Sequence, residues 1–307
     1  MGRYVIRRLL QMIPVFIGAT LLIFLMVNVM GDPIAGLCGQ RACDPSTAAQ
    51  LEKEFGLDKP VWQQYLTYMG NVFTGDFGTA FNGQPVTELM ASAFPVTIRL
   101  TLVAIFFEIV IGITLGVITG MRRGAPVDTG VLVLTLVVIS VPTFVTGLLL
   151  QLLLGVEWGW IRPSVSPGAP LDELIVPGLV LASVSLAYVT RLTRTSIAEN
   201  RRADYVRTAV AKGLPRRRVV GRHLLRNSLI PVITFIGTDI GALMGGAIVT
   251  ERIFNIHGVG YQLYQGILRQ NTQTVVGFVT VLVLVFLVAN LLVDLLYAVL
   301  DPRIRYA

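Results

Sequence analysis

Six long apolar segments constrain this chain more than any other feature of its sequence. The hydrocarbon core of a membrane is about 30 Å thick, and a helix needs about 20 mostly apolar residues to cross it. Only 14% of the 307 residues are charged, against roughly 25% in soluble domains, so much of the surface is expected to face lipid. The sequence therefore predicts an all-α membrane protein with six transmembrane helices, at residues 9–30, 95–121, 129–154, 173–195, 229–250 and 274–300.

The first and fourth of these segments carry particular expectations. The first has a cationic start and a longer apolar core than a cleavable signal peptide, so we expect it to be retained as a span. The fourth is the weakest, because Pro177 interrupts it and Arg191 and Arg194 stand near its end.

Lysine and arginine are distributed unevenly between the connections. Six of them fall in residues 31–94, 155–172 and 251–273, whereas sixteen fall in residues 1–8, 122–128, 196–228 and 301–307. Cytoplasmic loops of membrane proteins carry the excess of positive charge, so both termini are expected in the cytoplasm. The same distribution accounts for the net charge of +7, and no nucleic-acid partner is expected.

The first outer connection, residues 31–94, is too long for a plain loop and is predicted to hold one or two short helices. Cys38 and Cys43, the only cysteines, both lie in it. On the oxidising side of a membrane a disulfide between them is favoured over two free thiols. A metal site is not expected, because no further ligands cluster nearby.

Two spans carry glycines at every fourth position, which allows close approach of helices in lipid. Glu108 precedes Gly112 by four residues and so shares the face of the first series; we expect it to pack within a helix interface. Asp239 lies two residues off the second series and points away from it. It is expected to face either the translocation pathway or a polar partner on another helix. The packing glycines are Gly112, Gly116, Gly120, Gly237, Gly241 and Gly245, and the candidate pathway residues are Asp239, Phe235 and Gly246.

No catalytic residues are predicted. The chain has no G-x-x-x-x-G-K-[ST] phosphate loop and no H-E-x-x-H or G-x-S-x-G motif. Glu108 and Asp239 are the only acids in the middle of the predicted spans. They leave two alternatives open, a membrane enzyme and a secondary transporter that couples to protons at these two carboxyls.

The largest inner connection, residues 196–228, is densely cationic. "ADYVRTAVAKG" is compatible with a helix that stops at Gly213, and Pro215 suits the start of a second helix. A short amphipathic helix here would either lie on anionic lipid or dock in a groove of a partner protein.

Four separated motifs resemble the permease subunits of ATP-binding-cassette importers, in the branch that carries dipeptides, oligopeptides and nickel. "DYVRTAVAKGL" with "RHLLRNSLIP" is similar to the cytoplasmic coupling loop of that branch, without the glutamate of the general Glu-Ala-Ala pattern. "FGLDKPVWQQYLTYMGNVFTGDFGTAF" resembles its outer segment and "TERIFNIHGVG" its loop before the last span, with His257 where proline is common. "LLYAVLDPRIRY" is similar to its ending.

The resemblance implies a type I importer permease fold and a transport role without enzymatic activity in this chain. It implies a first helix at 1–30, an outer segment at 31–94, a permease domain at 95–300 and a tail at 301–307. The partners implied are a homologous second permease, two cytoplasmic ATPases that hold ATP and magnesium, an extracytoplasmic peptide-binding protein and membrane lipid. The location is a bacterial inner membrane and the cargo short peptides, with nickel or another small solute as the alternative.

The resemblance also assigns the coupling role by residue. Thr208, Ala209 and Gly213 would set close approach to an ATPase, and Arg207 and Lys212 would pair with its acids. The whole coupling set is Tyr205, Val206, Arg207, Thr208, Ala209, Lys212, Gly213, Leu214 and Pro215.

Overall fold

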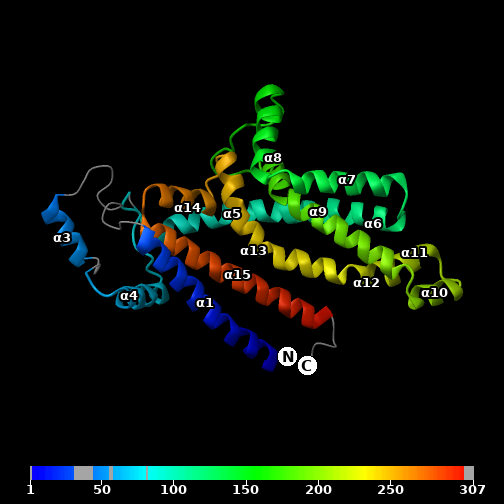
Figure 1. Ribbon diagram of the computed structural model, residues 1–307, viewed down its shortest axis with the longest axis horizontal. Helices are drawn as coiled ribbons and strands as arrows, with labels where there is room; N and C mark the ends of the chain where they lie inside the picture. The colour runs from blue at the N-terminus through cyan, green and yellow to red at the C-terminus, as the bar shows by residue number, and fades with distance from the viewer. Residues whose placement is uncertain (1, 31–43, 55–57, 81, 301–307) are drawn as a thin grey trace.

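The protein is a bundle of long helices that lie side by side (Figure 1). The computed structural model describes residues 2–30, 44–54, 58–80 and 82–300, and in these ranges the only β pairing is one isolated bridge between Thr79 and Pro85. Five continuous helical runs are long and apolar enough to cross a membrane. They are α1 (Gly2–Met30), α5–η1–α6 (Val86–Phe107, Glu108–Ile113 and Thr114–Met121), α9 (Ile175–Asn200), α13 (Ile230–Ile253) and α15 (Thr272–Leu300).

The third predicted span is a bent pair of helices and not a single rod. The axis of α7 (Pro126–Ser140) meets that of the following pair, α8 (Thr143–Leu150) and η2 (Gln151–Glu157), at 98°. Pro142 causes the break, because it lacks an N–H and disfavours helical geometry in the residue before it. Val141 is accordingly extended, with φ −93° and ψ 124°. In Figure 1, α7 runs along α6 and α9, while the rod formed by α8 and η2 starts at the bundle, where α8 contacts α9 and α13, and projects away from it.

The fourth span is uninterrupted, contrary to the expectation from Pro177. That proline is the third residue of α9. A proline is tolerated in the first turn, where its missing N–H would have had no helical partner. The helix then continues through Arg191 and Arg194 to Asn200.

Helix α9 is at the centre of the bundle and packs against α5, η1, α6, α7, α8 and α13. Helix α13 also packs against α15, and α15 packs against α1. The largest buried cluster joins α5, α9 and α13 through residues such as Leu100, Val180 and Ala247.

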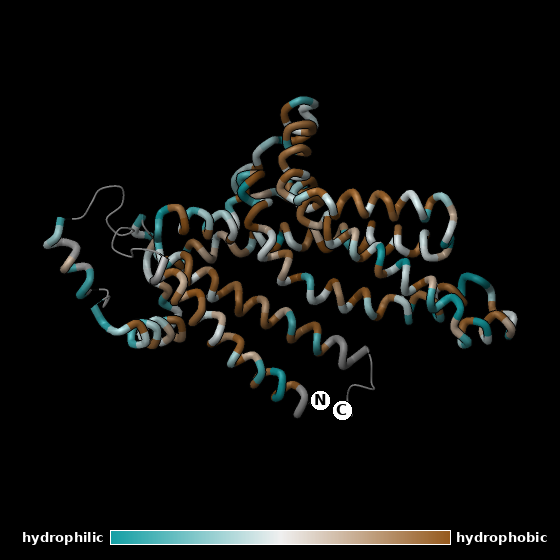
Figure 2. Tube along the Cα trace, in the orientation of Figure 1, coloured by the Kyte–Doolittle hydropathy of each residue, from teal (hydrophilic) through white to brown (hydrophobic). Residues whose placement is uncertain are grey.

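The connections are sorted to the two ends of the bundle. At one end lie α3 (Pro45–Glu54), α4 (Val61–Thr74) and α14 (Val259–Leu268), so two short helices occupy the first outer connection as predicted (Figure 1). At the other end lie the turn between α6 and α7 and the segment between α9 and α13. Figure 2 shows the bundle mostly apolar and the helices α3, α10 and α11 more polar.

The connection before α9 is held by Glu173. Its carboxylate accepts hydrogen bonds from the Ser166 backbone N–H at 2.6 Å and from the Ser166 hydroxyl at 3.0 Å, and Arg162 Nη1 lies 3.1 Å away. The Ser166 backbone bond, with the hydroxyl and Arg162, holds the pKa of Glu173 below its usual value.

Candidate functional site

The segment between α9 and α13 folds as a helix, a sharp turn and a second, irregular helix. Its parts are α10 (Asp204–Ala211), α11 (Arg216–Arg218), the π-helical turn η3 (Val219–Leu225) and α12 (Arg226–Ser228). We call residues 204–215 the coupling helix and turn.

Gly213 produces the sharp turn. It has φ +72°, a left-handed conformation that favours glycine after a helix end. Its amide donates to the Val210 carbonyl at 2.9 Å, and the Leu214 amide donates to the Ala209 carbonyl at 3.3 Å. Pro215 then precedes α11, in the extended conformation that suits a residue before a helix. The helix and its stop therefore lie where the sequence predicted them.

The coupling helix packs on η3, beside the ends of α6 and α9. Val206 and Ala209 are buried, 6% and 4% exposed. They form one cluster with Ile197 of α9 and with Val219 and Leu224 of η3, and Val117, Met121 and Leu214 pack against it. A displacement of α10 would therefore act on α9 and α6 through this cluster and through η3, on which α10 packs.

The opposite face of α10 is open. Arg207, Thr208, Lys212 and Gly213 are exposed, and so is Val210, at 61%. The ion pair between Arg207 and Asp204 is 3.8 Å long and solvent-exposed, so it contributes little and leaves both charges available. Ala209 points inward into this cluster, while Thr208 and Gly213 lie on the open face.

Polar contacts fix the two ends of this segment. The Ser196 hydroxyl donates to the Ser228 carbonyl at 2.9 Å, and the Tyr205 hydroxyl donates to Asn200 at 2.6 Å. Arg201 Nη1 donates to the carbonyl of Met121, the last residue of α6, at 2.6 Å.

A buried ion pair that the sequence analysis missed holds the neighbouring α6–α7 turn. Arg194 of α9 pairs with Asp128 of α7, and its Nη2 is 2.7 Å from the carboxylate. The same carboxylate accepts the Gly124 amide at 2.8 Å. The sequence offered one indication of this ion pair, namely that Arg194 stands near the end of the fourth predicted span and Asp128 near the start of the third.

The first glycine series lies directly against α9. Cβ atoms built on Gly112 and Gly120 would approach Val189 and Ile197 to 2.8 and 2.7 Å, and one on Gly116 would clash with Thr193. The helices can approach this closely only because these positions lack a side chain.

The second series makes two such contacts, both with α15. A Cβ on Gly237 would lie 2.6 Å from Val293, and one on Gly241 would clash with Phe286. Gly245 meets no atom within 4 Å, so it does not share in this packing.

The three candidate pathway residues lie on one face of α13, and this face follows α9. A Cβ on Gly246 would lie 3.7 Å from Leu181, and the Phe235 ring is 6.2 Å from that of Tyr188. Asp239, between them, interacts with Ser185. All three are partly or well exposed, so they line an edge where α9 and α13 meet.

Glu108 and Asp239 lie together. Glu108 is the first residue of η1, is fully buried and interacts with the Asp239 carboxyl. Within the described part of the chain, neither Glu108 oxygen has a hydrogen bond of good geometry, nor does Oδ2 of Asp239. The structure thus joins two acids that the sequence placed on separate helices.

A second network orders the opposite end of the bundle. Thr97 of α5 donates to Glu251 of α13 at 2.5 Å and accepts the Val259 amide at 2.8 Å, while the Tyr261 amide donates to Glu251 at 3.0 Å. A Cβ on Gly258 would clash with the same carboxylate. These contacts explain the motif "TERIFNIHGVG", whose glutamate the sequence analysis did not single out. Cys38 and Cys43 lie outside the described residues.

Comparison with known proteins connects this architecture to a family. Residues 112–306 match the family described as "Binding-protein-dependent transport system inner membrane component". Residues 1–101 match that of the "Binding-prot-dependent transport system membrane comp, N-term".

Individual relatives are similar along their whole length. The dipeptide transport system permease protein DppB of Escherichia coli (strain K12) is 39% identical, with 100% of this chain and 99% of the relative covered. The di/tripeptide transport system permease protein DppB of Pseudomonas aeruginosa is 38% identical, with 99% and 98% covered. The oligopeptide transport system permease protein AppB of Bacillus subtilis is 34% identical, with both chains fully covered. The chain therefore belongs to the inner membrane components of binding-protein-dependent transport systems, as a DppB-like permease of the ATP-binding-cassette class.

Proposed function

We propose that this chain is one of two permease subunits of an ATP-driven importer of short peptides in a bacterial inner membrane. The observation that carries the proposal is the full-length similarity to relatives named for dipeptide and oligopeptide transport. The second permease is a homologue of this chain, and the translocation pathway runs between the two. Both termini and the coupling helix face the cytoplasm, as the distribution of lysine and arginine supports.

In this proposal the chain itself carries no catalytic site. Two cytoplasmic ATPases bind ATP and magnesium, and a peptide-binding protein delivers cargo at the outer face. The open face of α10, with Arg207, Thr208, Lys212 and Gly213, contacts an ATPase. The inner face, with Val206 and Ala209, packs on η3 and passes the movement to α9 and α6 through the buried cluster that these elements share. The glycine contacts between α6 and α9 then make those two helices move together.

The domain boundaries follow the same division of labour. We assign residues 1–30 and 31–94 to the first helix and outer segment, 95–300 to the permease domain and 301–307 to the tail. Tyr205, Leu214 and Pro215 shape the coupling helix and turn. Cys38 and Cys43 form a disulfide on the outer side.

Reconstitution tests the function. The chain is co-expressed with the proposed second permease and the two ATPases, and the complex is reconstituted in liposomes. The peptide-binding protein is placed inside the liposomes in one set of experiments and outside them in another. We expect uptake of a radiolabelled dipeptide that requires ATP and all subunits, and no uptake of nickel. Uptake of nickel and not of peptide would replace the cargo, and uptake by this chain alone would overturn the proposal.

A further inference from the structure

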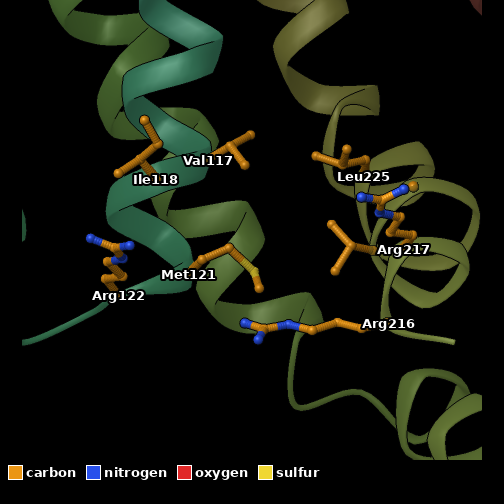
Figure 3. Close-up of a pocket in the computed structure, with 9 residues that line it drawn as sticks. Val117, Ile118, Met121, Arg122, Arg216, Arg217 and Leu225 are labelled. Atoms are coloured by element: carbon orange, nitrogen blue, oxygen red, sulfur yellow. The ribbon is translucent and has the colours of Figure 1, made fainter.

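A groove lies beside the coupling helix, between the inner end of α6 and the segment α11–η3. Its volume is about 880 Å³. Figure 3 shows Val117 and Met121 on the side of α6 that faces the groove, Ile118 and Arg122 at its outer edge on the other side of that helix, Leu225 on the opposite wall, and Arg216 directed across toward α6. The lining residues are Val117, Ile118, Met121, Arg122, Arg216, Arg217, Val220, Gly221 and Leu225.

The lining combines an apolar floor with cationic groups and has no acid. Val117, Ile118, Met121, Val220 and Leu225 supply the floor, and the three arginines supply guanidinium groups. Guanidinium groups bind phosphate through paired hydrogen bonds. An apolar floor beside phosphate-binding groups fits an amphipathic anion better than a free one.

The position of the groove indicates which amphipathic anion binds there. Its α6 wall is the last turn of the span Val86–Met121, and Arg122 follows immediately. Ile118 is 40% exposed on that wall, in a span that faces lipid. The floor thus lies where acyl chains begin, and the arginines lie where headgroups are found.

We propose that this groove binds one anionic glycerophospholipid of the inner leaflet. Its phosphate lies beside Arg216, which reaches across the groove, while Arg122 and Arg217 add positive charge at the two edges. Its upper acyl chains lie on the floor. The lipid would touch the machinery of coupling, because η3 forms one wall of the groove while its Val219 and Leu224 pack under α10. The site does not depend on which solute the transporter carries.

The experiment compares lipid retention by the assembled transporter, purified with its ATPases. Native mass spectrometry follows binding of phosphatidylglycerol and phosphatidylcholine from mixed micelles. The test variant is R122Q/R216Q/R217Q. The control is R218Q/R222Q/R226Q, which removes equal charge from residues that do not line the groove.

We expect the wild type and the control to retain phosphatidylglycerol in preference to phosphatidylcholine. Phosphatidylglycerol should bind the test variant roughly a hundredfold more weakly, since each arginine contributes about 1 kcal/mol. Val220→Trp, which fills the groove without changing charge, should also lower retention.

Three results would overturn the assignment. Equal loss in both triple variants would indicate diffuse attraction to the membrane surface. Displacement of the lipid by inorganic phosphate would indicate a simple anion site. Crosslinks from a cysteine at position 216 to an ATPase, with no lipid retained by the wild type, would assign the arginines to protein contact.

Discussion

At the scale of single residues, the missing side chains of glycine determine how closely two central helices approach. A Cβ on Gly116 would clash with the Thr193 Cβ and lie 2.7 Å from the Thr190 carbonyl. The carbonyl belongs to the backbone and cannot rotate away. Any side chain at position 116 must therefore separate α6 from α9 under the coupling helix.

We expect Gly116→Ala to destabilise the purified permease by about 1–3 kcal/mol, the usual cost of overpacking. Thermal unfolding in detergent measures the change. Gly130→Ala on α7 is the control, since a Cβ there meets nothing within 4 Å and alanine favours helix. Equal stability of the two variants would contradict the close packing.

Substitutions at Asp239 distinguish ATP-driven import from proton-coupled transport. Because ATP drives import in our proposal, no proton need be carried, and asparagine keeps the size of Asp239 and its polar contact with Ser185 without an ionisable carboxyl. We expect Asp239→Asn to keep ATP-dependent uptake and Asp239→Ala to lower it or shift peptide preference, measured in the reconstituted system. Abolished uptake in Asp239→Asn with intact ATP hydrolysis would support proton coupling. Unchanged kinetics in Asp239→Ala would assign the residue to packing alone.

At the scale of elements, the coupling helix is defined by its turn. No atom lies within 4 Å of a Cβ built on Gly213, so a side chain there would project outward, toward the proposed ATPase. The left-handed backbone adds strain of roughly 1 kcal/mol or more for residues other than glycine, and asparagine tolerates it best.

We expect Gly213→Trp to insert and pair with the second permease but to lose peptide uptake and its coupling to ATP hydrolysis. Gly213→Asn, which keeps the turn with a small side chain, should retain most of both. Uptake and stimulated ATP hydrolysis by the tryptophan variant at wild-type levels would discard the docking assignment.

Elements differ in how well the sequence predicts them. Apolar length located the spans, and Gly213 and Pro215 located the coupling turn, because both signals are local. The 98° bend at Pro142 escaped notice, since hydropathy reports length and not direction. Pro177 led to the opposite error, an interruption predicted in a helix that is continuous. The effect of a proline depends on where the helix begins, and Pro177 lies in the first turn of α9.

The site shows the same division between local and tertiary information. The motif identified α10, but the inward position of Ala209 follows from packing on Ile197 and Leu224. The meeting of Glu108 with Asp239 and of Asp128 with Arg194 depends on how α5–α6, α7, α9 and α13 are arranged. A single sequence holds no pairwise signal for such contacts.

At the scale of the whole molecule, the chain presents surfaces that are suited to contact with other subunits. Apolar side chains on α8 and η2, such as Leu148, Leu152 and Val156, are about half exposed or more, where lipid or a second permease would cover them. The face of α10 opposite its own packing is open as well. Such surfaces are expected of a subunit whose energy comes from partner ATPases and whose translocation pathway is completed by a second permease.

The most direct test of the account is crosslinking from the open face of the coupling helix in assembled transporter. Single cysteines at Thr208 and Ala211, both exposed, are compared with one at Val127, exposed in the first turn of the neighbouring helix α7. We predict that a short bifunctional reagent joins positions 208 and 211, but not 127, to an ATPase subunit, and that the joined complexes lose ATP-driven uptake. Failure of positions 208 and 211 to capture an ATPase in a complex that imports peptide would contradict the account.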